Sequence, residues 1–195
     1  MSNERGRLIV VSGPTASGKS TLWHRLVQRP EVDFSVSATT RAPRTGEKDG
    51  HDYHFLDETE FRARIGRGEF LEWAMVHGNL YGTLRTHVEA SIARGHDIVL
   101  EIDVNGAAQL EECGLPLVSI FVLPPSLEIL RQRLRDRGTE TEAQMQRRLA
   151  IVEKEMACAQ DYMFQVINDD FPRMEAEVNA LLGYADLAET QEERA

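Results

Sequence analysis

Cysteine is scarce in this sequence, and no apolar run is long enough to cross a membrane. The two cysteines, Cys113 and Cys158, lie far apart, which predicts neither a disulfide framework nor a metal-binding pair. Residues 1–7 are polar and lack the apolar core of a signal peptide. We therefore expect a cytoplasmic protein that has no membrane partner.

Basic charge is also in short supply. The 32 acidic residues outnumber the 22 lysines and arginines, which leaves a formal net charge of −10. Because nucleic acids and anionic membranes attract basic surfaces, we expect no nucleic-acid partner. The six histidines are scattered without the spacing of a zinc motif, so we expect no transition metal. Clusters of arginine in such an acidic chain indicate sites for small anions.

A phosphate-binding pattern is present near the N-terminus. An apolar run at 8–11 leads into Gly13-Pro14-Thr15-Ala16-Ser17-Gly18-Lys19-Ser20, which matches G-x-x-x-x-G-K-[ST], and Thr21 opens a helical pattern. The glycines let backbone N–H groups converge on a polyphosphate, and the helix adds the positive end of its dipole. We expect Lys19 to reach the β- and γ-phosphates of ATP or GTP and Ser20 to ligate Mg²⁺. The alternative is a glycine turn that binds nothing, but the flanking strand and helix favour the site.

The pattern of apolar residues predicts an α/β fold with a central parallel sheet flanked by helices. Buried strands are expected at 8–11, 97–103, 117–123 and 165–168, and helices at 21–28, 126–137, 139–161 and 172–182. A mixed insertion lies between them, with strands expected at 34–40, 53–56, 70–76 and 79–83 and helices at 60–66 and 84–94. We expect Asp57 and Ser126 to cap helices, and Thr139 to form a capping box with Glu142.

Two carboxylates end the strand expected at 97–103. Glu101 and Asp103 are two positions apart, so in a strand they face the same side. They also lie at the carboxyl end, where open α/β sheets bind ligands. Two exposed acids without a function are the alternative. We expect the pair to lie near a bound ligand.

Arginines gather on both sides of Gly138. They are Arg131, Arg133, Arg135, Arg137, Arg147 and Arg148. A solvated helix face is the default for each, and we keep it for Arg131 and Arg135. Arg137 and Arg148, however, flank a glycine that could act as the hinge of a closing lid. Their forked donors suit the charge on a phosphoryl group in transfer, and we expect them in that role, with Arg133 and Arg147 as further candidates.

Several further blocks share one resemblance. Residues 35–47 read SVSATTRAPRTGE and residues 50–55 read GHDYHF. They are followed by FLEWA at 70–74, NLYGT at 79–83, EIDVNG at 101–106, RGTET at 137–141 and VINDD at 166–170. In this order the blocks closely resemble guanylate kinases over residues 7–182. Several blocks together are far more specific than the phosphate loop alone.

The resemblance implies that ATP phosphorylates GMP, and also dGMP, with Mg²⁺, in purine nucleotide metabolism. It implies a single P-loop kinase domain in three parts: a core at about 5–33, 95–137 and 160–185, a GMP-binding insertion at about 34–94, and a helical lid at about 138–159. A polar tail follows at 186–195. No catalytic base is needed, because the acceptor phosphate has a second pKa of about 6 and is mostly dianionic at neutral pH.

The resemblance also assigns residues. It implies that Arg41, Arg44, Tyr53 and Tyr81 hold the GMP phosphate, and that Ser37, Glu72 and Thr83 read guanine. The Glu72 carboxylate would accept from N1–H and the exocyclic amine, while hydroxyls donate to O6. It further implies that Asp103 and Glu101 lie near the phosphates and Mg²⁺, and that Asn168 lies near the adenine of ATP. Its catalytic group comprises Lys19, Arg41, Asp103, Arg137 and Arg148.

Two positions depart from the family pattern. Ala16 replaces a common glycine of the phosphate loop, but the outer Gly13 and Gly18 remain, so we expect phosphate binding to survive. Glu101 stands where some relatives carry aspartate, and the carboxylate persists on a longer arm. Neither change removes a needed charge.

Two other functions remain open at this point. A non-catalytic guanylate-kinase-like module that binds partner proteins would lack a working phosphate loop, whereas Lys19 and Ser20 are present here. A different P-loop kinase would act on another acceptor. Glu72 and the hydroxyls of Ser37 and Thr83 argue against that alternative.

Overall fold

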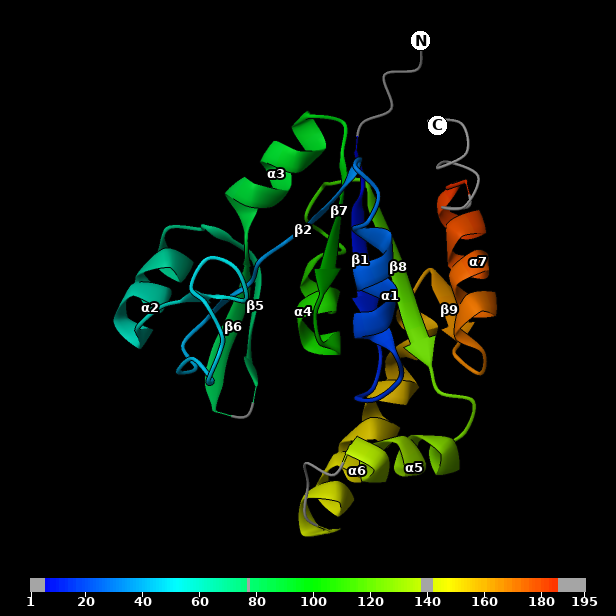
Figure 1. Cartoon of the computed structure of the whole chain (residues 1–195). Helices are drawn as coiled ribbons and strands as arrows, with labels where there is room; N and C mark the ends of the chain where they lie inside the picture. The colour runs from blue at the N-terminus through cyan, green and yellow to red at the C-terminus, as the bar shows by residue number, and fades with distance from the viewer. Residues whose placement is uncertain (1–5, 77, 138–141, 186–195) are drawn as a thin grey trace. The chain divides into compact units, whose positions relative to one another are not determined.

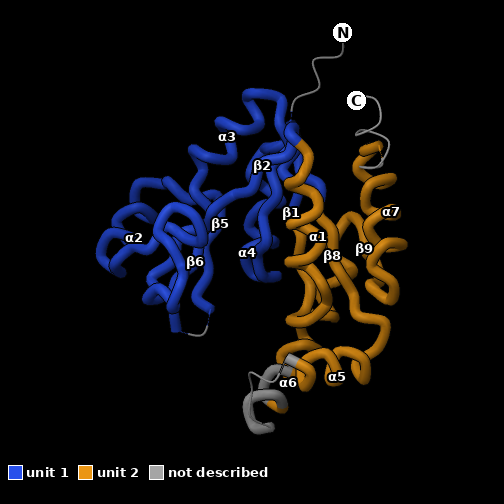
Figure 2. Tube along the Cα trace, viewed as in Figure 1, with its two compact units in different colours: residues 1–10, 30–118 blue, residues 11–29, 119–195 orange. Residues whose placement is uncertain are grey.

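The structure is a computed structural model that describes residues 6–76, 78–137 and 142–185, with the side chains at 137, 142–145, 147 and 148 outside that description. The chain divides into two compact units, residues 1–10 with 30–118 and residues 11–29 with 119–195 (Figure 2). The strands of the described residues form two sheets (Figure 1), one of five strands and one of four.

The five-stranded sheet has the order β2-β7-β1-β8-β9. Its strands are β1 (Leu8–Ser12), β2 (Val32–Phe34), β7 (Asp97–Glu101), β8 (Leu117–Leu123) and β9 (Phe164–Ile167). β1 is buried along its whole length, and the pairs β2–β7 and β8–β9 are parallel. Apolar strands covered on both faces are typical of a parallel sheet between helices. The predicted α/β fold with a central parallel sheet is confirmed.

Four α-helices lie within the described residues of the unit formed by 11–29 and 119–195. They are α1 (Lys19–Leu26), α5 (Leu127–Arg137), α6 (Glu142–Ala157) and α7 (Phe171–Leu182). The predicted cap of α5 is confirmed, because the Ser126 hydroxyl accepts a hydrogen bond from the Ile129 N–H at 3.1 Å. The helix expected to reach Asp161 instead ends at Ala157 and continues as a 3₁₀ turn. Thr139 of the predicted capping box lies outside the described residues.

The four-stranded sheet belongs to the other unit and has the order β4-β3-β6-β5. Its strands are β3 (Ala38–Thr39), β4 (His54–Phe55), β5 (Phe70–Val76) and β6 (Asn79–Leu84), and the same unit holds α2 (Glu58–Gly66) and α3 (Arg85–Ala93). The predicted strand pair is confirmed as the antiparallel β5–β6 pair, and so is the Asp57 cap of α2, which accepts from the Glu60 N–H at 2.8 Å. A small apolar core supports this sheet, made of Ala38, Phe61, Phe70, Leu80 and Leu84.

The single strand predicted at 34–40 is wrong. The chain leaves β2 at Phe34 and joins the other sheet as β3 at Ala38, so the run belongs to two sheets. The Ser35 N–H still donates to Val99 O at 3.0 Å, while the Ser37 carbonyl already accepts from the His54 N–H at 2.9 Å. Alternating side chains indicate extended backbone but carry no information on which strand becomes the partner.

The strand predicted at 97–103 is wrong at its end, and a short helix follows it. β7 ends at Glu101, and Asp103 caps α4 (Val104–Gln109) by accepting from the Gly106 N–H at 2.9 Å. Glu101 and Asp103 therefore do not share a strand face. The helix was missed because Asn105 and Gly106 have low helix propensity, which masked the N-cap signal of Asp103.

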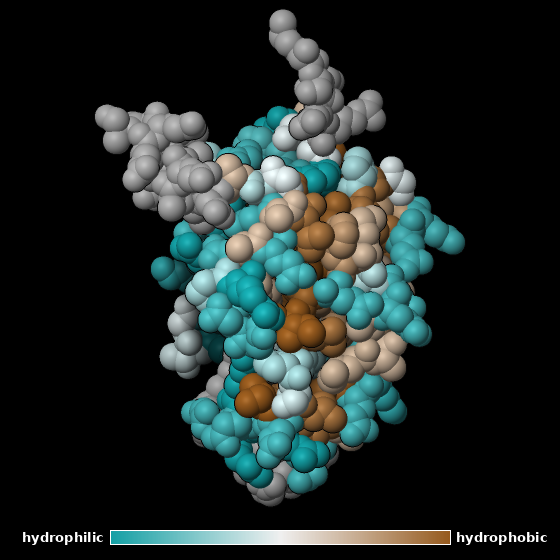
Figure 3. Space-filling model, turned by 90° about the vertical axis from the view of Figure 1, so that its right-hand side faces the viewer, coloured by the Kyte–Doolittle hydropathy of each residue, from teal (hydrophilic) through white to brown (hydrophobic). Residues whose placement is uncertain are grey.

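Among the helices within 6–76, 78–137 and 142–185, none has the length and apolar character needed to span a bilayer. Figure 3 shows the face that carries α7 and β9, where apolar side chains form a band between hydrophilic flanks. Two apolar residues at the edge strand β9 are exposed. Ile167, the last residue of β9, is 46% exposed, and Met163, just before the strand, is 59% exposed.

Candidate functional site

The phosphate loop connects β1 to α1 and depends on its two outer glycines. Gly13 and Gly18 have φ angles of +145° and +103°, which favour glycine. Space also demands glycine, because a Cβ on Gly13 would overlap with Val122 O and one on Gly18 would overlap with Asn168 Nδ2. Lys19 begins α1, and its Nζ donates to Pro14 O at 3.0 Å. The two outer glycines therefore have the positive φ that the motif predicts for them.

Ala16 takes a backbone conformation that favours glycine. Its φ is +60°, and it is the one non-glycine residue with positive φ in the described part of the chain. Left-handed backbone costs an L-residue about 1–2 kcal/mol. The Ala16 side chain packs against an apolar cluster of α5 and α6 formed by Leu130, Leu134, Leu149 and Val152. That packing offsets part of the backbone cost.

Asn168 and Arg133 support the phosphate loop through hydrogen bonds to backbone carbonyl groups. The Asn168 side chain, 7% exposed, donates from Nδ2 to Ser17 O at 2.7 Å. Arg133 donates to Asn168 O at 2.9 Å and to Ala16 O at 3.5 Å. A pocket beside the loop is lined by Ala16, Gly18, Thr21, Arg133, Asp136 and Asn168. The sequence did not predict this bracing, because residues 16, 133 and 168 meet only through the fold.

The arginines expected to close over the phosphates cannot be placed. The side chains of Arg137, Arg147 and Arg148 and residues 138–141 lie outside the described residues. Their helices, α5 and α6, pack through the apolar cluster that also contacts Ala16. Arg131 and Arg135 are exposed, as expected for a solvated face.

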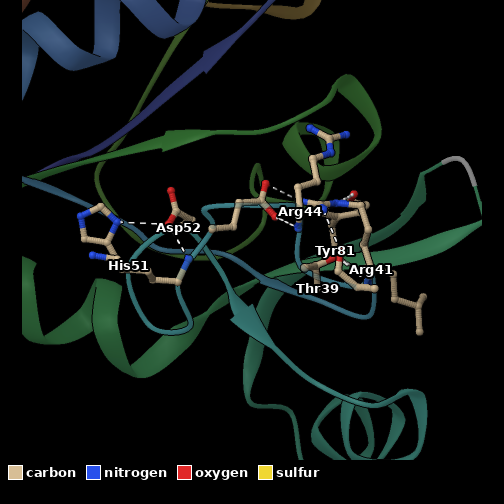
Figure 4. Close-up of polar contacts among 10 residues, drawn as sticks. Thr39, Arg41, Arg44, His51, Asp52 and Tyr81 are labelled. Atoms are coloured by element: carbon tan, nitrogen blue, oxygen red, sulfur yellow. Dashed lines mark hydrogen bonds and ion pairs between the residues drawn. The ribbon is translucent and has the colours of Figure 1, made fainter.

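Three of the residues predicted to hold the GMP phosphate lie together in the unit of the four-stranded sheet, and Figure 4 shows two of them, Arg41 and Tyr81. Arg41 Nε donates to the Tyr81 hydroxyl at 3.2 Å, and the Arg41 guanidinium lies 5.3 Å from the centre of the Tyr53 ring. The rings of Tyr53 and Tyr81 meet edge to face at 5.9 Å. Burial raises the pKa of Tyr53, and the electrostatic influence of Tyr81 adds to the rise. The Tyr53 phenol therefore keeps its proton and remains a hydrogen-bond donor.

Glu47 organises this group, although the sequence assigned it no role. Its carboxylate accepts from Arg41 Nη2 at 2.9 Å and from the Arg44 backbone N–H at 2.7 Å. The hydrogen bond from Arg41 lowers the pKa of Glu47 and raises the pKa of Arg41 above its ordinary value. The Arg44 side chain is exposed and extends away from Arg41 and Tyr81 (Figure 4), so the fourth predicted phosphate ligand is not gathered with the other three.

The predicted guanine-reading residues include one buried carboxyl group. Glu72 on β5 is only 4% exposed, and its Oε1 accepts from the hydroxyl of Thr83, its partner on β6, at 2.6 Å. Burial raises the pKa of Glu72 to about 7, with a further rise from the Asp103 carboxylate, although the Thr83 hydrogen bond opposes the shift. Ser37 is half-buried just before β3. Buried acceptors of this kind suit a ligand with paired N–H donors.

The two predicted strand-end acids have different settings. Glu101 is half-buried at the end of β7, and its charge contributes to the raised pKa of Tyr53. Asp103 is the N-cap of α4 and influences Glu72. Within the described residues, no group of three or more His, Cys, Asp or Glu side chains could hold a metal ion. Oxygen donors for a hard cation are available at Ser20, the second residue of α1.

Comparisons with known proteins identify the family of this chain. The family model described as guanylate kinase matches residues 5–184. Guanylate kinases of Symbiobacterium thermophilum and Aromatoleum aromaticum are 47% and 48% identical over 179 and 166 residues, covering 91% and 85% of this chain and 85% and 81% of theirs. A crystal structure of guanylate kinase from Anaplasma phagocytophilum matches with a TM-score of 0.75 at 34% identity, covering 92% of this chain and 86% of that one. The chain therefore belongs to the guanylate kinase family.

Proposed function

We propose that this protein is a guanylate kinase, which transfers the γ-phosphoryl group of ATP directly to GMP and yields ADP and GDP. The observation that carries the proposal is the buried Glu72 carboxyl group held by Thr83. Burying a carboxylate is costly unless a ligand or a partner satisfies it, so its presence points to a ligand with matching donors. Family membership and the formed phosphate loop support the same reaction.

The phosphate loop would bind ATP through the backbone N–H groups around residues 13–19 and the start of α1. Lys19 would exchange its contact with Pro14 O for the β- and γ-phosphates. The Ser20 hydroxyl and the nucleotide phosphates fit the oxygen preference of Mg²⁺. When bound, Mg²⁺ would neutralise charge on the β- and γ-phosphate oxygens. Asn168 would border the adenine through the pocket beside the loop.

The GMP phosphate would lie among Arg41, Tyr53 and Tyr81, with Arg44 turning inward from its exposed position. Two guanidinium groups and two phenols can supply a dianion with charge-assisted hydrogen bonds. Glu47 would hold Arg41 in place and keep it from folding onto other acceptors. The contacts within this group support binding of a small, doubly charged anion.

Guanine would be selected by Glu72, Thr83 and Ser37. The ionised Glu72 carboxylate would accept from N1–H and the exocyclic amine of guanine. Because a hydroxyl has one proton and Thr83 donates it to Glu72, Thr83 can only accept further hydrogen bonds. The donor to guanine O6 would then be Ser37. AMP presents an acceptor at N1 and would leave Glu72 unpaired, which predicts strong discrimination.

Catalysis would require alignment and charge neutralisation, since the phosphate acceptor needs no base. Lys19 and Arg41 would stabilise the donor and acceptor phosphates. Arg137 and Arg148 would contribute the charge that moves in with the lid. Asp103, whose Oδ1 is held by the Gly106 N–H, would present its other oxygen toward the phosphates and Mg²⁺, with Glu101 nearby.

A panel of acceptors tests the proposal. ADP formation from ATP and Mg²⁺ is measured in a coupled assay with GMP, dGMP, AMP, UMP and CMP. We expect turnover with GMP and dGMP and rates for AMP lower by at least about 10⁴-fold in kcat/KM. Turnover of another acceptor would identify a different P-loop kinase, and silence with all five would support a binding module.

A further inference from the structure

α4 and β5 meet at the residue expected to read guanine. The Gln109 side-chain amide on α4 donates to Trp73 O at 2.7 Å, and its carbonyl oxygen accepts from the Trp73 N–H at 3.2 Å. Trp73 lies on β5, an edge strand of the four-stranded sheet, so this amide pairs with the strand as a neighbouring strand would. α4 is therefore fastened to β5 one residue away from Glu72.

Gly106 faces the Glu72 side chain across this contact. Gly106 is fully helical and buried, and its N–H is fixed by Asp103 Oδ1 at 2.9 Å. A Cβ at this position would overlap with Glu72 Oε2 and lie 3.1 Å from its Cδ, where real contacts almost never fall below 3.0 Å. The carboxylate occupies the space that any other residue at 106 would fill.

Glu72 has no alternative place for its carboxylate without losing its orientation. Its other oxygen is held by Thr83 at 2.6 Å, and the residue is 4% exposed. A methyl group at 106 would push Oε2 away and break or bend that hydrogen bond. Selection of guanine depends on both carboxylate oxygens meeting two donors at fixed positions.

We propose that Gly106 is a positioning residue for guanine selection, because the absence of a side chain at this position leaves the space that the Glu72 carboxylate occupies. The inference rests on the proposed function of Glu72 as the reader of guanine. Backbone conformation does not require this glycine, since its φ lies outside the left-handed region. Helix propensity also favours alanine over glycine by about 1 kcal/mol. The contact with Glu72 is what excludes a side chain.

Gly106→Ala tests the proposal, with Gly66→Ala as the matched control. Gly66 ends α2, has no positive φ, and a Cβ there would have no neighbour within 4 Å. For each variant we would measure kcat, the KM values for GMP and ATP, the GMP-to-AMP ratio of kcat/KM, and thermal unfolding. We expect Gly106→Ala to raise KM for GMP about tenfold or more and to lower the GMP-to-AMP ratio, with KM for ATP unchanged. Gly66→Ala should match the wild type in every kinetic measurement, and its unfolding temperature should equal or exceed that of the wild type because alanine favours helix.

A double variant shows whether Gly106 acts through Glu72. In a Glu72→Ala background the space is open, so adding Gly106→Ala should change kcat/KM for GMP less than about twofold, because coupled sites are not additive. If the single Gly106→Ala variant does not fold, recovery of folding in the double variant would support the steric conflict, and failure of both to fold would overturn it.

Two further results would overturn the inference. One is an unchanged KM for GMP in Gly106→Ala, and the other is a loss in the double variant that multiplies the two single losses. In both cases GMP turnover by the wild type would leave the proposed function standing. Absence of GMP turnover in the wild type would instead contradict the proposed function itself.

Discussion

At the scale of single residues, the Glu72 carboxyl group bears an electrostatic cost of burial in the proposed GMP site. It is buried, and the Thr83 hydroxyl donates a hydrogen bond to it. Burial, assisted by Asp103, raises its pKa to about 7 from an ordinary value of 4.5. The folded protein therefore binds a proton at Glu72 more readily than the unfolded chain does.

This linkage predicts how stability changes with pH. Because the pKa of Glu72 is higher in the folded state, its contribution is complete below about pH 4.5 and is lost as pH rises through 7. Glu72→Gln removes the titration, so its free energy of unfolding relative to wild type should rise by up to about 3 kcal/mol between pH 5 and pH 8. Urea unfolding at the two pH values measures the difference. Parallel pH profiles for the two proteins would contradict the assigned pKa.

The same titration should affect binding of GMP. Guanine N–H groups need an ionised acceptor, so KM for GMP should fall between pH 6 and pH 8 as Glu72 loses its proton. The phosphate of GMP titrates near pH 6 as well. Glu72→Gln shares that phosphate titration but lacks the carboxyl group, and it should show a higher KM, a flatter profile and weaker discrimination against AMP. Full GMP selectivity in Glu72→Gln would show that the guanine contacts are wrong.

Replacing Lys19 should impair catalysis without disturbing the fold. Lys19→Ala removes the cation expected at the transferring phosphoryl group, and kcat should fall by about 10²–10³-fold. The matched control is Lys154→Ala on α6, which removes an exposed lysine. Initial rates with saturating GMP measure the effect, and circular dichroism checks the fold. Near-normal kcat for Lys19→Ala would contradict the role of Lys19.

At the scale of elements, the phosphate loop balances strain against packing. Ala16→Gly should relieve about 1–2 kcal/mol of left-handed strain. It should lose about 1 kcal/mol from glycine entropy and up to about 1 kcal/mol from the partly buried methyl group. We expect the free energy of unfolding to change by less than about 1 kcal/mol, measured in urea. Ala16→Val, β-branched at φ +60°, should be clearly less stable, and equal stability of the valine variant would contradict the strain.

Replacing Arg133 should affect the KM for ATP but not the KM for GMP. Arg133 holds Ala16 O and Asn168 O, so Arg133→Met should loosen the loop and raise KM for ATP about threefold to tenfold. KM for GMP should stay unchanged. The control is Arg131→Met on the exposed face of α5, which should behave as the wild type. Equal KM values for ATP in both variants would exclude bracing by Arg133.

At the scale of the whole molecule, the two units carry different parts of the proposed reaction. The phosphate loop and Asn168 belong to residues 11–29 and 119–195, while the expected GMP-binding residues belong to 1–10 and 30–118. Each unit has its own apolar core around its part, as the clusters at Phe61 and at Leu130 illustrate. The finer division into core, insertion and lid stays a prediction.

Local sequence patterns predicted most helices and strands but not the point at which the chain passes from one sheet to the other. The caps at Asp57 and Ser126 were predictable because a cap involves neighbours in sequence. The break between Phe34 and Ala38 was not, since pairing depends on distant strands. The helix cap at Asp103 was missed because the apolar run at 97–103 was predicted to be a strand up to that residue.

The sequence by itself determined the phosphate loop, the α/β fold and the family, since these rest on residue types at fixed spacings. It also named Glu72, Arg41, Tyr53 and Tyr81 through resemblance. Only the tertiary structure decided that Gly106 gives Glu72 its place and that Arg133 and Asn168 brace the loop. Those contacts join residues far apart in the chain, and their energies depend on burial and atomic distance, which no local pattern encodes.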